Sequence, residues 1–242
     1  MDAFEREIIN ELNAVRLNPQ SYISLLREYK NYFHKNEILK VPNVKVGIKT
    51  IEGPSAYEEA AKFLENQKPI NPIKCHKGLC RVALELLDVI QRTPIENINS
   101  INTEKIIQNY GTFLGSLSQL IDFGGTSPQL VVSNFLVSDG DSNREQRKTI
   151  FNEDLCFISI AYREDKKYEI CTVIVICSKF TSTNLNDDTE INCHLNSNVI
   201  YDLNNDNLQL NQIHEFFKID KDIENEKSKK KPLKLLKILK LQ

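Results

Sequence analysis

The chain has 242 residues, of which 40% are hydrophobic and 26% charged, and its formal net charge is −2. That length and apolar content suffice for one well-packed domain with extensions. The small net charge excludes an overall field that would draw the chain to nucleic acid or to a membrane. The longest apolar run, residues 173–177, is far too short to span a membrane.

The first half of the chain is predicted to be mainly helical. Residues 4–17 carry apolar side chains at three- and four-residue steps, as in an amphipathic helix, and Pro19 is expected to end that helix. Further helices are predicted over residues 19–33, 54–64, 77–91 and 103–109. We expect extended or irregular chain over residues 41–54 and a proline-punctuated loop over 68–72.

The second half alternates strand and helix signals. Residues 119–122 are strand-like, residues 127–136 favour a helix with proline in its first turn, and residues 139–143 indicate a turn. Two β-rich runs at 156–162 and 168–177, joined by charged residues, predict a hairpin. The whole pattern predicts an α+β fold, either an α/β/α sandwich or another α+β arrangement.

Composition changes after Phe180. Residues 181–207 are rich in Asn, Asp, Ser and Thr, residues 208–219 favour one short helix, and residues 221–242 are rich in lysine and leucine. We therefore predict one compact domain over residues 1–182. The remainder, 183–242, is interpreted as a polar linker, a short helix and a basic amphipathic tail.

Several short motifs occur in a recognisable order. Residues 13–22 read N-x-x-R-x-x-P-x-x-Y, and the remaining motifs are 52–64, 79–88, 105–111 (K-I-I-Q-N-Y-G), 119–124 (Q-L-I-D-F-G), 138–147 (S-D-G-D-S-N-R-E-Q-R), 150–152 (I-F-N) and 171–180. Together they resemble the CAP (SCP-like) superfamily, which includes plant pathogenesis-related proteins and insect venom antigens. The resemblance covers about residues 5–180 and implies an α/β/α sandwich of the CAP type.

The resemblance also implies where a functional cleft would lie. The family's cleft usually holds two histidines and two acidic residues that can bind a divalent metal. Here the matching positions are Leu86 (or Leu87), Gln119 and Gln146. Leucine has no lone pair for a metal, and glutamine neither titrates nor carries charge. We therefore expect a degenerate site with no catalysis, no metal and no cofactor, in which both glutamines hydrogen-bond inside a retained fold.

Other chemistry receives weaker support. The six cysteines lie at positions 75, 80, 156, 171, 177 and 193. The first seven residues lack the features of a secretory signal peptide, so we expect a cytoplasmic chain with reduced thiols, and three disulfides are the alternative. A cysteine–histidine nucleophile pair lacks an orienting motif. A zinc site built from Cys75, His76, Cys80, Cys193 and His194 matches no standard spacing. The calcium-loop-like residues 139–150 have Arg144 where glycine is needed and Ile150 where glutamate is needed, which excludes that reading.

The tail supplies the candidate partner-binding residues. Its lysines are Lys229, Lys230, Lys231, Lys234, Lys237 and Lys240, interleaved with leucine and isoleucine. Such a segment is typical of chains that bind an acidic protein surface, an anionic membrane or a partner's groove. A disordered solubilising tail is one alternative, and a nuclear-localisation signal at residues 229–231 is another.

These observations give a functional hypothesis. We expect a non-catalytic structural or adaptor subunit of a larger intracellular assembly, with other proteins as partners and no specific nucleic acid. The abundance of Asn, Ile and Lys resembles AT-rich protist coding, which makes a ciliary or cytoskeletal assembly, with an acidic surface such as that of microtubules, the candidate setting. A lipid- or sterol-binding module and, more weakly, a residual hydrolase are the alternatives.

Overall fold

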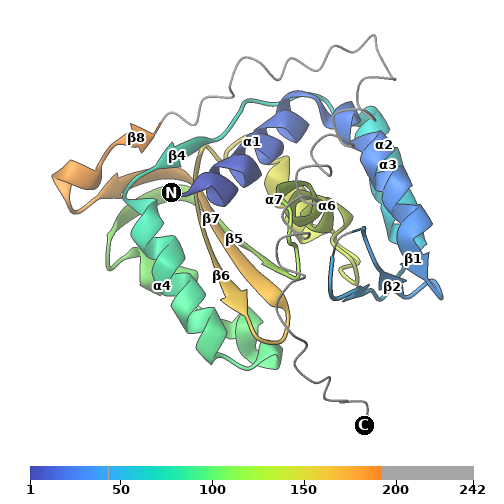
Figure 1. The fold of residues 1–242 in the computed structure, drawn as a ribbon. Helices are drawn as coiled ribbons and strands as arrows, with labels where there is room; N and C mark the ends of the chain where they lie inside the picture. The colour runs from blue at the N-terminus through green and yellow to red at the C-terminus, as the bar shows by residue number, and fades with distance from the viewer. Residues whose placement is uncertain (43, 192–242) are drawn as a thin grey trace, which may run out of the picture. The chain divides into compact units, whose positions relative to one another are not determined.

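The computed structural model describes residues 1–42 and 44–191 (Figure 1). The predicted helix at 208–219 and all six tail lysines lie outside the described residues. The chain begins with α1 (Ala3–Leu17), where the Asp2 side chain accepts from the backbone of Glu5 and the Glu5 side chain accepts from the backbone of Asp2. This capping box satisfies N–H groups that have no partner within the helix. The predicted first helix is confirmed.

The second predicted helix is divided into short pieces. These are η1 (Pro19–Tyr22), α2 (Ile23–Tyr29) and η2 (Lys30–Tyr32). The segment that follows forms a small antiparallel sheet of β1 (Phe33–His34), β2 (Ile38–Leu39) and β3 (Ile48–Lys49), in that order. The prediction of an extended or irregular segment after residue 40 is therefore confirmed in outline.

The remaining helices form largely where the periodicity placed them. They are α3 (Pro54–Asn66), α4 (Leu79–Arg92), α5 (Thr103–Ile107) and α6 (Pro128–Val137). The helix α7 (Glu145–Ile150) and the turn η3 (Ile95–Ser100) were not predicted. In the described part of the chain, no helix combines the length and apolarity that a membrane crossing requires.

The larger sheet has the strand order β5-β7-β6-β4-β8. Its strands are β4 (Lys74–His76), β5 (Gly111–Phe123), β6 (Phe157–Asp165), β7 (Glu169–Ser182) and β8 (Glu190–Ile191). The predicted hairpin is confirmed as the antiparallel pair β6–β7, and β4 runs parallel to β6. The predicted strand at 119–122 proves longer, because β5 pairs with β7 from Gly111 onwards.

Helices cover both faces of this sheet (Figure 1). On one face, α4 and α5 pack against Val173, Val175 and Cys177 of β7. On the other face, Ile174 and Ile176 of the same strand belong to a second core that also contains residues of α1, α3 and α6. Because successive side chains of a strand point to opposite faces, the apolar run in β7 serves both cores. The predicted α+β class, with helices on both sides of a sheet, is confirmed.

The fold continues past the predicted boundary at residue 182. A 3-10 turn, η4 (Leu185–Asp187), leads to β8, where Ile191 pairs with Cys75 and Glu190 with His76. These residues add a strand to the edge of the larger sheet. The polar composition that suggested a linker therefore includes a short segment that belongs to the compact domain.

Candidate functional site

The motif at residues 13–22 makes structural contacts. The Asn13 side-chain amide donates to the Ile73 carbonyl at 3.0 Å and accepts from the Ile73 backbone N–H at 2.7 Å. The Asn13 side chain thus makes with Ile73 the two hydrogen bonds that the backbone of a neighbouring strand would make, just before β4 begins. The hydroxyl of Tyr22 donates to Glu11 at 2.6 Å, within α1. Both motif side chains thus fix α1 against the chain around it.

Arg16 is the most deeply buried charged side chain of this motif, at 1% exposed. Its Nε donates to the Asn71 carbonyl at 2.8 Å, and its Nη1 donates to the Ile150 carbonyl at 2.5 Å. Further bonds reach the carbonyls of Asn152 and Leu155 at 3.2 and 3.3 Å. Burial lowers the pKa of Arg16 to about 10. The guanidinium therefore satisfies carbonyls after α7 that no helix or strand would otherwise pair.

Two other motif segments meet in an ion-pair network, here called the arginine cluster and defined by Glu52, Glu59, Arg144 and Arg147. The Nη1 and Nη2 atoms of Arg147 bind the two oxygens of Glu59 at 2.7 and 2.5 Å. Arg144 binds Glu52 in the same two-pronged way at 2.5 and 2.6 Å. The cluster joins α3 and the turn before it to α7 and the residue that precedes α7.

The two positive and two negative charges of the arginine cluster neutralise one another. The hydrogen bond from Arg144 lowers the pKa of Glu52 to about 2, and the hydrogen bond from Arg147 lowers the pKa of Glu59. The Arg147 side chain is 3% exposed, donates also to the Leu136 carbonyl at 2.5 Å, and lies over the Phe63 ring at 4.9 Å. Its donors are occupied by partners within the fold, so the cluster serves as a structural clasp.

The CAP resemblance placed three substituted site positions at Leu86, Gln119 and Gln146. The first two face the layer formed by α4 and α5. Leu86 is fully buried in the α4 core, among apolar side chains. Gln119 lies on β5, where its side-chain oxygen accepts a short hydrogen bond from the Thr103 hydroxyl. Gln119 and Thr103 also line an open hollow of about 480 Å³ between η3, α5 and β5. The expectation that Gln119 hydrogen-bonds within the fold is confirmed.

Gln146 lies in α7, which packs against α6 in the opposite layer. Its side-chain oxygen is buried and accepts no hydrogen bond from the described residues, so the expectation that Gln146 hydrogen-bonds inside the fold fails for that oxygen. Leu86 and Gln146 are both absent from the lining of the hollow beside Gln119. The described structure does not gather the three positions around one pocket.

Sequence reasoning missed one buried acid, Asp122 near the end of β5. It is 5% exposed, accepts from the Asn134 side chain at 2.7 Å, and accepts from the Gly125 backbone N–H at 2.9 Å. Burial raises the pKa of Asp122 from 3.8 to about 6, although both hydrogen bonds oppose that rise. An aspartate at an inward-facing position of an apolar strand was the signal that could have identified it.

Of the residues considered for zinc, His76 lies at the end of β4 beside two aromatic rings. His76 packs edge-on against Phe157 and Phe180, accepts from the Gly78 backbone N–H at 3.2 Å, and faces Asp188 at 3.4 Å. Burial lowers the pKa of His76. Cys193 and His194 lie outside the described residues. Within residues 1–42 and 44–191, His, Cys, Asp and Glu side chains nowhere form a group of three that could hold a metal ion.

Comparisons with protein-family models, with curated proteins and with solved structures each returned no match.

Proposed function

We propose that this chain is a non-catalytic, CAP-like scaffold whose folded domain carries a basic tail that binds an acidic macromolecular partner. The observation that carries the proposal is the structural use of the motif side chains. Asn13, Arg16 and Arg147 are the polar residues by which the chain resembles the CAP superfamily, and each is bonded within the fold. Their chemistry maintains the architecture and is not directed to a substrate.

The neutral side chains at the family's site positions agree with this proposal. Leu86 contributes only packing, and the Gln119 oxygen is engaged by Thr103. Neither side chain titrates, and neither offers the anionic or imidazole ligand on which zinc chemistry depends. Function is therefore assigned to binding surfaces outside the core, foremost the lysine-rich segment 221–242.

The state of the cysteines favours an intracellular setting. In the described part of the chain, four cysteines are free thiols, at positions 80, 156, 171 and 177. Unpaired thiols are typical of compartments in which glutathione and thioredoxin keep cysteines reduced. We propose a cytoplasmic assembly, with a cilium or the cytoskeleton as the candidate location and microtubules as the acidic surface.

Co-sedimentation with polymerised microtubules tests the proposal. The full chain is compared with a variant in which the six tail lysines are changed to glutamine at positions 229, 230, 231, 234, 237 and 240. A matched control changes six exposed lysines of the folded domain to glutamine, so that the net charge is the same; these are Lys45, Lys62, Lys68, Lys105, Lys166 and Lys179. We expect the tail variant to lose most of its binding and the control to retain it.

Salt provides the second measurement, because contacts between exposed charges weaken as ionic strength rises. Binding of the full chain is expected to fall steeply between about 0.05 and 0.2 M salt. Equal binding by the two variants would refute the role of the tail. Binding to anionic phospholipid vesicles in place of microtubules would replace the protein partner by a membrane, and a lipid retained in native mass spectra would favour the lipid-binding alternative.

A further inference from the structure

The small sheet formed by β1, β2 and β3 has one face on the core and one face toward solvent. In its register Leu39 pairs directly with Phe33 on one side and with Ile48 on the other. Leu39 is buried in the core that contains residues of α1, α3 and α6, and the other two side chains pack against that core. Directly paired residues share a face, and successive residues of a strand alternate between faces. The residues that flank these three therefore form the outer face.

The register arranges the outer face in two rows, one of direct partners and one a pair further along. The rows are His34, Ile38 and Lys49, and Tyr32, Lys40 and Gly47. A Cβ at Gly47 would lie 3.9 Å from the Cβ of Lys40 and 2.5 Å from the Cγ2 of Ile38, so the glycine lies between those two side chains. Lys40 and Lys49 are thus diagonal neighbours across β2 and β3. At a diagonal spacing of about 7–8 Å, long side chains are within reach of one ligand.

A hollow of about 530 Å³ opens on this face, and this section calls it the small-sheet hollow. Its lining includes Asn31, Tyr32, His34, Ile38, Lys40 and Gly47. Its volume lies within the range of small-molecule sites, about 300–1,000 Å³. Among the described residues that line it there is no aspartate or glutamate. The polar side chains of the lining include an ammonium, an imidazole and an amide, which are donors suited to an anion.

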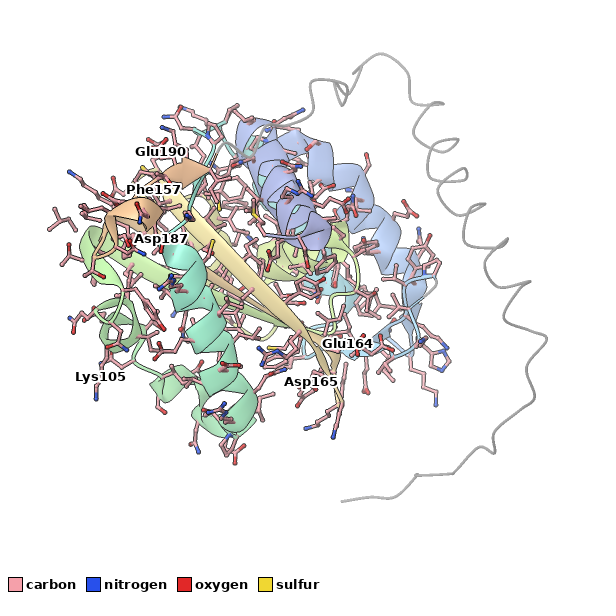
Figure 2. All side chains as sticks on the ribbon, turned by 60° about the vertical axis from the view of Figure 1, so that its left-hand side comes forward. Lys105, Phe157, Glu164, Asp165, Asp187 and Glu190 are labelled. Carbon is pink, nitrogen blue, oxygen red and sulfur yellow. The ribbon has the colours of Figure 1, made fainter. Side chains whose placement is uncertain are left out.

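The lysines of the outer face are not neutralised by the fold. Lys40 and Lys49 are exposed, and residues 35–49 contain four lysines against one glutamate. Other exposed lysines have carboxylate partners. At the end of the larger sheet where Figure 2 labels Asp187 and Glu190, the lysines at positions 77 and 74 bind these acids at 3.0 and 2.8 Å. In the part of the chain that the structure describes, neither Lys40 nor Lys49 has such an ion pair.

The border of the small-sheet hollow also offers apolar surface. The Ile38 side chain is 36% exposed. The Tyr32 hydroxyl donates to Glu28 at 2.6 Å, which holds the Tyr32 ring at the border of the hollow and engages the carboxylate. A ligand that carries both an anionic group and an apolar group would therefore find a partner for each.

We propose that the small-sheet hollow binds a small phosphate monoester whose ester group is apolar or aromatic. The phosphate carries nearly two negative charges and three acceptor oxygens, which two ammonium groups can engage together. Lys40 and Lys49 supply these groups, and the Asn31 amide adds a neutral donor. The ester group packs against Ile38 and the Tyr32 ring. This site is separate from the tail, so the inference goes beyond the proposed function.

Titration of the ¹⁵N-labelled full chain with phenyl phosphate at low ionic strength tests the proposal. The signal followed by NMR is the backbone amide of Gly47, so phosphate taken up by the tail does not enter the measurement. We expect this amide to shift on titration. Changing both Lys40→Gln and Lys49→Gln is expected to weaken the affinity about tenfold. The matched control is Lys62→Gln with Lys68→Gln, two exposed lysines on and after α3, and it should leave the affinity unchanged.

Three further probes separate the parts of the ligand. Inorganic phosphate lacks the apolar group and benzoate carries one charge, so we expect both to bind more weakly than phenyl phosphate. An unmoved Gly47 amide, equal losses in the two double variants, or equal binding of benzoate and phenyl phosphate would each overturn the proposal. Binding of phosphatidic acid vesicles without binding of phenyl phosphate would also overturn it, since the face would then serve a membrane. All these proteins keep the tail unchanged, so this proposal and the proposed function fail separately.

Discussion

At Arg147, a nearly buried cation depends on one carboxylate that is itself half exposed. The Arg147 side chain is 3% exposed and that of Glu59 is 46% exposed. Removing the charge of Glu59 leaves the guanidinium with backbone carbonyls and a phenyl ring as its remaining neighbours. A buried charge without its counter-ion is costly, although solvent around Glu59 reduces the cost.

We therefore predict that Glu59→Gln lowers the free energy of unfolding by about 2 kcal/mol. Urea denaturation measures the change. The matched control on the same helix is Glu65→Gln, whose partner Arg27 is 45% exposed, and which we expect to cause no measurable loss. Equal effects of the two substitutions would show that the arginine cluster does not act as a clasp.

Asp122 makes stability depend on pH in the direction opposite to most carboxylates. Its pKa is about 6 in the folded chain against an ordinary 3.8, so the folded state holds the proton more tightly than the unfolded state does. The stabilisation is full below about pH 4 and is lost as the pH rises through about 6. The difference between the two pKa values corresponds to about 3 kcal/mol.

The prediction compares the unaltered chain with Asp122→Asn, so that contributions of all other groups cancel. Between about pH 4 and about pH 7, the stability of the unaltered chain relative to the variant should fall by about 2.4 kcal/mol, because part of the unfolded chain has already lost this proton at pH 4. Chemical denaturation at a series of pH values gives this difference. Asp154→Asn, at an exposed position, controls for the loss of a charge. A difference that stays constant with pH would mean that Asp122 keeps its ordinary pKa.

Among the elements, α1 is tied to the chain after α7 by one side chain. Arg16 reaches four carbonyls, at Asn71, Ile150, Asn152 and Leu155. Lysine has one nitrogen at its tip and cannot reproduce the fork of a guanidinium. Arg16→Lys therefore leaves buried carbonyls without donors.

For Arg16→Lys we predict a loss of about 3 kcal/mol in the free energy of unfolding. Amide hydrogen exchange should also quicken in residues 150–156, where the freed carbonyls lie. Arg6→Lys is the control, because Arg6 lies on the same helix but is exposed. Unchanged exchange in that segment would mean that Arg16 does not hold the chain after α7.

Helices and strands whose own side chains show a clear periodicity could be predicted from the sequence. Short elements that form only by pairing with a distant strand could not. α1, α4 and the β6–β7 hairpin follow from side-chain periodicity within the segment itself. β4 and β8 have three and two residues, which is too short for any periodicity. α7 was read as a motif and not as a helix, because a six-residue helix contains fewer than two full turns.

For the candidate site as well, the sequence indicated some residues but not the contacts that they make. Asn13, Arg16 and Arg147 were singled out by motif, but their partners were not, since Arg16 bonds a carbonyl 134 residues away.

For the whole molecule, one sheet supports two hydrophobic cores, one on each of its faces. β7 contributes side chains to both, with Ile174 and Ile176 on one face and Val173 and Val175 on the other. Damage to either core should therefore be transmitted through the shared strand. Unfolding is expected to be cooperative across both layers.

This predicts similar behaviour for Leu86→Ala in the α4 layer and Leu12→Ala in the α1 layer. Each removes a fully buried side chain and should cost about 3 kcal/mol. Each should also leave a single urea transition, with the same midpoint by circular dichroism and by tyrosine fluorescence. Two separate transitions in either variant would show that the layers fold independently.

The edge strand β5 has a consequence for self-association. Its outer edge is not paired with any strand in the described chain, and a long, regular row of unpaired amides is a template for fibril growth. The bulge between Leu114 and Leu117, with Gly115 at a φ of +81°, interrupts that row. A second molecule approaching this side meets two short, misaligned segments in place of one continuous template, so the bulge protects the domain against sheet-to-sheet polymerisation.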